Sequence, residues 1–456
     1  MGKVLNVPEL VDQSSYGSLQ WRTFGLCLLC LILDGFDVQA LGYTAPSIVR
    51  EWGVSPALLG PVFAAGNVGV LIGALFGSML ADRVGRRPIL IASTFFFAAM
   101  TLLTTRMTSI PELLILRLIA GIGMGTIIPN ASALVGEYSP QRLRATMIML
   151  VGVGFTIGAA IGGFIANALI PRFGWHSVFY LGGVLPIALA LAMMVSLPES
   201  LQLMVLRQKS KAKIAKWLNQ IDPRANATAD SEFVVREENK QGVPIFHLFR
   251  EGRGIATTIF WVVNFMNLLN LYALSNWLAI VVTQMGYPMQ AVLVSTTLQV
   301  GGTIGTFGLA WLVARFGFVR VMSVTFAIAA VSIAAIGQPG VSLPLIFVIV
   351  FIAGWCIVGS QPGLNALSGA YYPTYVRSTG VGAGLGIGRI GAIVGPVVGG
   401  QFIAAQWATS DMFLAAAVPA AISAIAMLSL NWVIGTRLGV SAKSSATLAP
   451  RTGLAG

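Results

Sequence analysis

Long runs of apolar residues, separated by short polar segments, occupy nearly the whole chain of 456 residues. Each run is about 20 residues long, which is the length of helix that crosses ~30 Å of hydrocarbon. The runs therefore predict an all-α membrane protein with about twelve transmembrane helices rather than a barrel of short strands. We expect these helices over residues 23–46, 57–81, 88–106, 111–136, 144–169 and 175–197, and then over residues 255–283, 289–314, 319–337, 342–369, 378–405 and 411–435.

The second half of the chain repeats the first. A shift of 233 positions superimposes Gly121 on Gly354 and Arg144 on Arg377, together with several other Gly and Pro residues. Such a repeat predicts two pseudo-symmetric six-helix halves, with a substrate site near the midplane between them. The expected organisation is a cytoplasmic N-terminal tail (1–22), the first half (23–197), a cytoplasmic central loop with some helix (198–254), the second half (255–435) and a cytoplasmic tail (436–456).

Composition and charge exclude two other classes of protein. Hydrophobic residues make up 56% of the chain and charged residues only 10%, which is too little charge to cover a soluble protein. The net charge of +12 could indicate a nucleic-acid partner, but the basic residues gather in every second loop, as the positive-inside rule describes. We therefore expect no nucleic-acid partner, both termini in the cytoplasm and an even number of helices.

Two carboxylates lie inside the first predicted helix, where an ionised side chain costs about 2.5–3.5 kcal/mol. They are Asp34 and Asp37, three residues apart and so on one helix face. Asp34 follows Arg22 by 12 residues, and Arg389 follows Arg377 by the same number. At 1.5 Å per residue both groups are about 18 Å deep. A carboxylate pair from one half and a guanidinium from the other are thus expected to share the midplane.

These groups predict a site for an acid and a proton. Arg389 keeps its charge, and its planar fork matches a carboxylate, so we assign it to the anionic group of the substrate. Burial and mutual repulsion favour the protonated form of the two aspartates, so we assign them to proton coupling. The alternative is that Arg389 is only a structural partner of an aspartate.

Amide and aromatic side chains add polarity to two further helices. The seventh predicted helix carries Asn267, Asn270 and Trp277, and the tenth carries Gln361 and Asn365. Amides beside aromatic rings suit an aromatic acid with ring hydroxyls, although ordinary hydrogen bonds between helices are an alternative.

No motif in the sequence points to an enzyme or to a bound cofactor. There are only two His and three Cys, and neither a metal-spaced cluster nor a phosphate-binding loop occurs. We expect no metal, no cofactor and no enzymatic activity, with a proton gradient as the energy source.

The loop after the second predicted helix reads Gly77-Ser-Met-Leu-Ala-Asp82-Arg83-Val-Gly85-Arg86-Arg87. It resembles the signature loop of the major facilitator superfamily, and the run Arg117-x-x-x-Gly121-x-Gly123-x-Gly125 resembles a second signature of that family. The resemblance covers the whole chain and implies a secondary transporter with a cytoplasmic latch formed by Gly77, Asp82, Arg83, Gly85, Arg86, Arg87 and Arg144.

In this latch we expect Gly77 to allow close helix packing and Asp82 to accept hydrogen bonds from a helix N-terminus. The arginines anchor at the anionic leaflet. The second-half copy of the loop is degraded, with Ala314 where the family often keeps Asp.

The segment Asp34-Gly35-Phe36-Asp37 resembles the D-G-x-D signature of the aromatic acid:proton symporter branch of this family. Glu137-Tyr-Ser-Pro-x-Arg-x-Arg144 and Tyr372-Pro-Thr-Tyr-Val-Arg377 match other parts of the same branch. The resemblance implies roles for Asp34, Asp37 and Glu137 in proton coupling, and for Arg117, Arg377 and Arg389 in substrate binding. It also implies a monomeric carrier in the bacterial inner membrane that imports a benzoate-like or hydroxybenzoate-like acid.

Three other functions are compatible with the same pattern. One is a proton-coupled carrier of a diacid or a heteroaromatic acid. Another is a proton-driven exporter, which would leave Arg377 and Arg389 without an obvious role. The third is a membrane sensor that binds an acid without moving it, although the sequence contains no signalling domain.

Overall fold

The computed structural model describes residues 4–235, 245–373 and 375–447, with side chains as far as Leu430. Within this part of the chain, twelve helical segments are long and apolar enough to cross a membrane, as predicted. The first six are formed by α2 (Ser18–Trp52), η1 with α3 (Pro56–Leu58 and Leu59–Val84), α4 (Arg86–Thr104), α5 with α6 (Ile110–Gly125 and Ile127–Tyr138), α7 (Gln141–Phe173) and α8 (His176–Ser196). The other six are formed by α11 (Gly254–Gln284), α12 (Ala291–Phe316), α13 (Phe318–Ile336), α14 with α15 (Leu343–Ile357 and Ser360–Tyr371), α16 (Arg377–Ala404) and α17 (Thr409–Thr447).

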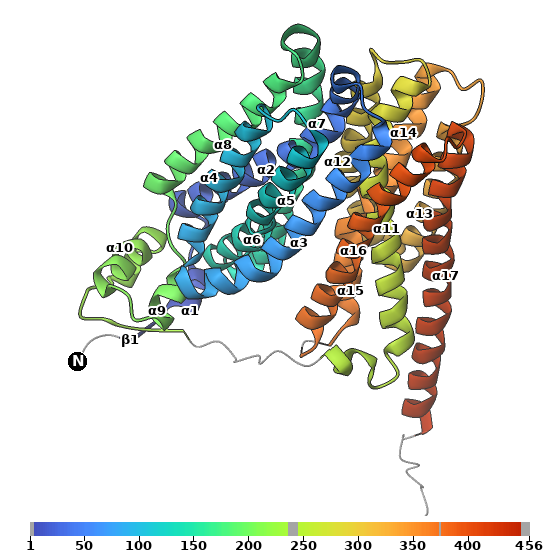
Figure 1. Cartoon of the computed structure of the whole chain (residues 1–456). Coiled ribbons are helices and arrows are strands. Elements are labelled where there is room, and N and C mark those ends of the chain that lie inside the picture. Colours follow the sequence, from blue (N-terminus) through green and yellow to red (C-terminus); the bar gives the residue numbers. More distant parts are fainter. Residues whose placement is uncertain (1–3, 236–244, 374, 448–456) are drawn as a thin grey trace, which may run out of the picture.

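The two halves are built by the same helix pairings (Figure 1). In the first half α2 packs on α7, α3 on α5 and α4 on α8, and in the second half α11 packs on α16, α12 on α14 and α13 on α17. Equivalent glycines make equivalent contacts. A Cβ on Gly158 would lie 1.9 Å from the carbonyl oxygen of Ile32, and a Cβ on Gly391 would lie 2.2 Å from that of Phe265. Only glycine allows the paired backbones to approach so closely.

The halves touch near one end of the molecule and diverge at the other (Figure 1). The contacts join α2 to α11, α3 to α16 and α7 to α12. Across this interface the amide of Gln39 donates to the carbonyl oxygen of Ser275 at 3.3 Å, and the amide of Asn67 donates to that of Ala392 at 3.0 Å. We call this the closed end and the opposite one the open end.

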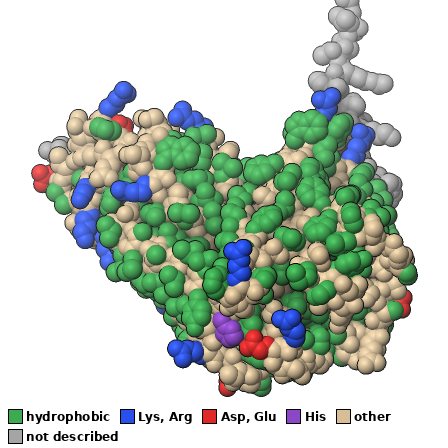
Figure 2. All heavy atoms as spheres, turned by 90° about the horizontal axis from the view of Figure 1, so that it is seen from above, with side chains coloured by type: hydrophobic (Ala, Val, Ile, Leu, Met, Phe, Trp, Pro, Cys, Tyr) green, Lys and Arg blue, Asp and Glu red, His purple; other side chains and the backbone are tan. Residues whose placement is uncertain are grey.

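Charge is distributed unevenly between the two ends. Figure 2 looks down on the closed end, where hydrophobic and uncharged side chains cover most of the surface and charged groups are scattered. The arginine-rich loop between α3 and α4 lies at the open end, and so do α1 and the lower end of α17 (Figure 1).

A small module formed by the N-terminal tail and the central loop packs on the open end of the first half. It contains β1 (Val4–Asn6), α1 (Val7–Gln13), α9 (Leu201–Leu206), α10 (Lys211–Ile221), η2 (Pro223–Ala225) and β2 (Glu232–Val234), and β1 pairs in parallel with β2. Ile214 and Leu218 of α10 lie in one hydrophobic cluster with Leu5 and Val11. The polar N-terminal tail and the central loop therefore carry more structure than their composition suggested, and η3 (Ile245–Phe249) continues the loop to the second half.

The C-terminal tail expected from residue 436 begins as a continuation of α17, which runs to Thr447. Residues 448–456 of that tail lie outside the described part of the chain.

Candidate functional site

A buried ion pair joins α2 to α5 in the first half. Asp37 is fully buried, and its Oδ2 lies 3.2 Å from Nη1 of Arg117, which is 5% exposed. The Thr101 hydroxyl donates to the other carboxylate oxygen at 2.8 Å. The Arg117 guanidinium also donates weakly to Thr104 at 3.5 Å and lies over the ring of Phe179, 4.8 Å from its centre. Both oxygens of Asp37 thus have partners that stabilise the anion.

Asp34 has no comparable support. Its side chain lies one turn below Asp37 and is only 2% exposed, and its Oδ1 atom has no hydrogen-bond partner among the described residues. It interacts electrostatically with Asp37 and, across the interface between the halves, with Arg389. A buried carboxyl group without a donor is far more costly as an anion than as a neutral acid.

Arg389 enters the site from α16. Its Nη1 donates to the Tyr272 hydroxyl of α11 at 3.1 Å, and the side chain is half-buried. Its charge also acts on Asp34 of the first half. Tyr272 thereby becomes a member of the site beside Arg389.

A small cavity lies above these groups at the closed end. Arg117 and Asn67 line it from the first half, and Tyr272 and Asn276 line it from the second. Its volume of about 40 Å³ has room for a few water molecules, not for an aromatic ring. Access for a larger molecule in this conformation is therefore from the open end.

An amide network connects α11 to α15 in the second half. The Asn267 amide donates to Gln361 Oε1 at 2.8 Å, and the Gln361 amide donates to Asn264 Oδ1 at 3.1 Å and to Asn365 Oδ1 at 3.5 Å. Ser360 donates to Asn267 Oδ1 at 3.3 Å. Three of the predicted site residues, Asn267, Gln361 and Asn365, are thus brought together.

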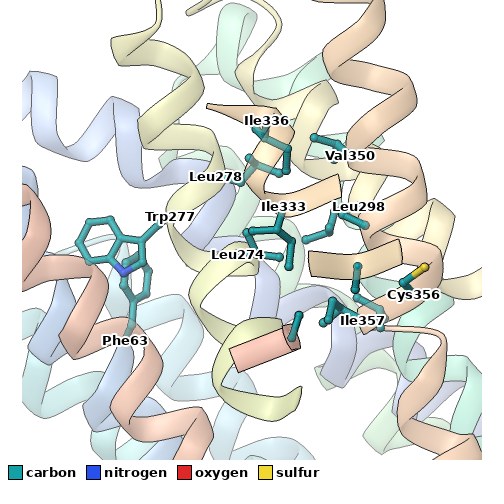
Figure 3. Close-up of a cluster of buried hydrophobic side chains, with 14 of the residues drawn as sticks. Phe63, Leu274, Trp277, Leu278, Leu298, Ile333, Ile336, Val350, Cys356 and Ile357 are labelled. Atoms are coloured by element: carbon teal, nitrogen blue, oxygen red, sulfur yellow. The ribbon is translucent and has the colours of Figure 1, made fainter. Parts of the chain in front are cut away.

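Two other predicted residues have different surroundings. The Asn270 amide, in the orientation that satisfies both of its atoms, bonds to the carbonyl oxygen of Ala416 at 2.8 Å and to the N–H of Ala420 at 3.3 Å, both on α17. The Trp277 ring donates to the Pro396 carbonyl oxygen at 2.9 Å and packs edge-on against Phe63 with ring centres 5.4 Å apart (Figure 3). In this conformation Asn270 makes its hydrogen bonds within the second half, and Trp277 contributes to the contact between the halves at the closed end.

The predicted latch residues gather at the open end of the first half. Arg86 forms an ion pair with Glu137, and the carboxylate of Glu199 accepts from the backbone N–H groups of Arg86 at 3.0 Å and Arg87 at 3.1 Å. Glu199 therefore occupies the N-terminus of α4. The Asp82 side chain is exposed, and Glu137 lies with these arginines rather than with Asp34 and Asp37.

The remaining latch residues make local contacts. A Cβ on Gly77 would lie 2.2 Å from Cγ2 of Thr126, so this glycine allows the expected close packing. Arg144 pairs with Asp12 of α1 at 3.4 Å, and Arg377 donates to the Tyr372 carbonyl oxygen at 3.4 Å. Gly85 has φ of 128°, a conformation that favours glycine, and Arg207 of the central loop donates to the backbone carbonyls of Asp82 and Arg83.

Sequence reasoning missed Thr101, Thr104 and Glu199. Within the described part of the chain, no group of three or more His, Cys, Asp or Glu side chains is placed to hold a metal ion.

Comparison with known proteins places these features in a family. The family model described as Major Facilitator Superfamily matches residues 27–337 and 260–452. The 4-hydroxybenzoate transporter PcaK of Pseudomonas putida is 36% identical over 94% of this chain and 96% of its own length. The gallate transporter of Pseudomonas putida is 36% identical over 93% and 94%, and the benzoate transport protein of Acinetobacter baylyi is 30% identical over 94% of each chain.

Solved structures share the fold at lower identity. A bacterial homologue of the human lysosomal transporter Spinster, in an inward-facing and unoccupied conformation, matches with a TM-score of 0.68 and 18% identity over 90% of this chain and 97% of its own. The nucleoside transporter NupG matches with a TM-score of 0.67 and 15% identity over 90% and 98%. At this level of identity the likeness concerns the fold alone.

Proposed function

This chain belongs to the major facilitator superfamily, and we propose that it imports an aromatic carboxylate together with protons by alternating access. It is a transporter rather than an enzyme, and it is a multi-pass protein of the inner membrane. One observation carries the proposal: buried Asp34 has no hydrogen-bond partner at Oδ1 among the described residues, and it interacts electrostatically with Arg389 of the other half. The printed names of the relatives, which are carriers of hydroxybenzoate, gallate and benzoate, support an aromatic acid as the cargo.

Asp34, rather than Asp37, is proposed to carry the proton. Asp37 is compensated as an anion by Arg117 and Thr101, whereas nothing compensates Asp34 at its Oδ1 atom. Protonation of Asp34 removes a costly buried charge and leaves the nearby Arg389 without a competing anion. Arg117 is proposed to act through Asp37 instead of binding the substrate directly.

The substrate carboxylate is proposed to bind Arg389, with Tyr272 holding the guanidinium. The amide network of Asn264, Asn267, Gln361 and Asn365 supplies polar groups for ring hydroxyls in the same half. Arg377 is proposed to act at the open end, where it bonds to the loop before α16.

The open end is proposed to face the cytoplasm, because it carries the arginine-rich loop and the structured part of the central loop. On this orientation the described conformation is open to the inside, and residues 23–197 and 255–435 are the two halves that rock against each other. The segments 1–22, 198–254 and 436–456 are proposed to be cytoplasmic, and the carrier is proposed to work as a monomer.

The proposed coupling has a simple energetic consequence. One proton moving with one monovalent acid is electroneutral, so uptake is driven only by the pH difference across the membrane. A second proton would add about 2.3 kcal/mol per 100 mV of membrane potential. The dependence of uptake on voltage therefore reports the number of protons.

The test is uptake of a labelled acid panel into proteoliposomes with an alkaline interior. The panel contains benzoate, a hydroxybenzoate, a pyridine carboxylate and an aliphatic diacid, so it also tests the alternative cargoes. We expect the wild type to accumulate the aromatic acids. Asp34→Asn should lose accumulation but keep exchange of labelled for unlabelled acid, because the substrate site is retained.

The matched control is Asp411→Asn, which removes an exposed carboxylate at the start of α17 and should accumulate acid like the wild type. Substrate affinity of the wild type should be highest at low pH and fall as pH rises through the titration of Asp34, whereas the Asp34→Asn protein should bind with little dependence on pH. Normal accumulation by Asp34→Asn would remove Asp34 from the proton pathway. Failure of every aromatic acid to move would refute the proposed cargo.

A further inference from the structure

One sizeable cavity lies apart from the proposed transport site. It lies on the outer side of the second half between α12, α13 and α14, and it measures about 470 Å³, within the range of ligand pockets. Leu309 and Cys356 form buried parts of its lining, while Val324 and Ile328 are exposed at its edge. From Arg320 to Ile328 it extends along eight residues of α13, or about 12 Å. We call it the α13 groove.

One end of the α13 groove is cationic. Arg320 lines the groove at the open end of α13. Arg315 lies in the last turn of α12, with its guanidinium 5.7 Å from the centre of the Phe316 ring. Neither arginine forms an ion pair with a described residue. The rest of the lining is apolar apart from Thr325.

Among the residues that the structure describes, no carboxylate pairs with either of these two arginines. From residue 252 to the C-terminus the only acidic residue is Asp411, and it lies at the start of α17, at the closed end. Glu251 is already bound to Arg253 and Tyr375. The described part of the second half thus leaves the cationic end of the α13 groove without an anionic partner.

The first half shows what occupies the equivalent place when a carboxylate is available. A shift of 232 positions superimposes Arg83 on Arg315 and Gly85 on Gly317, so α4 is the counterpart of α13. At the start of α4 the carboxylate of Glu199 accepts two backbone N–H groups, and Glu137 pairs with Arg86. At the same shift Arg315 keeps the cation of Arg83, but Phe318 and Val319 stand where the first half has Arg86 and Arg87, and Ala314 stands where it has Asp82.

From this cavity and its charge we propose that the α13 groove binds one anionic glycerophospholipid of the leaflet at the open end. The phosphate lies at Arg320 and Arg315, and one acyl chain fills the apolar groove between α12, α13 and α14 (Figure 1). The position suits a lipid better than a soluble anion, since the groove opens to the membrane-facing side through Val324 and Ile328. The phosphate lies near the start of α13, as the Glu199 carboxylate does at the start of α4, and the lipid attaches α13 to the leaflet.

Native mass spectrometry of the purified protein, titrated with phosphatidylglycerol or phosphatidylcholine in detergent, tests this site. We expect one phosphatidylglycerol to bind in preference to phosphatidylcholine. The double variant Arg315→Gln/Arg320→Gln should weaken this lipid about 30-fold, the factor expected for two such cations at an anionic headgroup. The matched control Lys211→Gln/Lys213→Gln removes the same charge from exposed positions on α10 and should bind the lipid like the wild type.

A second variant tests the groove without changing charge. Val324→Trp fills the groove at an exposed position and should also displace the phosphatidylglycerol, so the test stands even if the arginine variant folds poorly. The proposal is overturned if the arginine variant keeps the preference for phosphatidylglycerol, or if the lysine control loses it equally. Competition by soluble glycerol 3-phosphate as strong as that by the lipid would likewise reject a lipid occupant.

Discussion

Replacement of Asp37 by Asn is expected to destabilise the folded protein by about 3–5 kcal/mol, the usual effect of removing one partner of a buried ion pair. Asp37 is fully buried, and Arg117 is 5% exposed with its Nε unpartnered among the described residues. Without the carboxylate, the guanidinium keeps only the long contact to Thr104 and the ring face of Phe179. A ring face contributes at most about 2 kcal/mol to a desolvated cation, which does not replace an ion pair.

The assay is the free energy of unfolding of the purified protein in mixed micelles, compared with that of two other variants. Asp34→Asn should change it by less than about 1 kcal/mol, because no hydrogen bond is lost at Oδ1. The double variant Asp37→Asn/Arg117→Met removes both charges and should recover most of the lost stability. Equal stability of Asp37→Asn and the wild type, or a double variant no more stable than the single one, would refute the reasoning.

Three further predictions concern other contacts. Gly163→Val should disfavour the closed contact between α7 and α12, because a Cβ there would lie 2.0 Å from the Thr296 hydroxyl. Labelling of a cysteine introduced at the closed end should therefore rise, and unchanged labelling would contradict the role of this contact. Glu199→Gln should lower the free energy of unfolding by about 1–2 kcal/mol, because a charged helix cap is lost, whereas Asp82→Asn should leave it unchanged. If both variants changed the free energy of unfolding equally, capping by Glu199 would be excluded. Tyr272→Phe should raise the KM for uptake of an aromatic acid several-fold without changing stability, because the removed hydroxyl orients Arg389. An unchanged KM in uptake assays would count against that role.

The sequence was sufficient to predict the twelve helices and the two-half architecture, because both depend on features that a chain displays directly. A helix that crosses the bilayer needs an apolar run of matching length, so the runs can be counted as helices. The repeat of Gly, Pro and Arg positions indicates the pseudo-symmetry of the two halves. The depth of Asp34 and Arg389 could likewise be counted from the nearest loop, since the rise of a helix is constant.

The direction in which a side chain points was harder to predict. Asn264, Asn267 and Asn270 are spaced by three residues, and each step turns a helix by about 300°, so the first and last differ by about 120°. This explains why Asn264 and Asn267 join the network of Gln361 while Asn270 bonds to α17. Contacts between distant segments, such as Thr101 with Asp37 or Glu199 with the start of α4, have no signature in either local sequence.

The two halves share helix pairings but differ in where they hold charge, and this difference supports the proposed coupling. The first half buries Asp34 and Asp37, whereas the second half contributes Arg389 and contains one acidic residue, Asp411, at its closed end. The proposed proton site and the proposed anion site lie on opposite halves, so they interact across the interface that the proposed alternating access would rearrange. With Asp34 ionised, Arg389 already has an anionic neighbour, so a substrate carboxylate has to compete; with Asp34 neutral it does not. Proton and acid binding then reinforce each other, as reciprocal linkage between two sites requires.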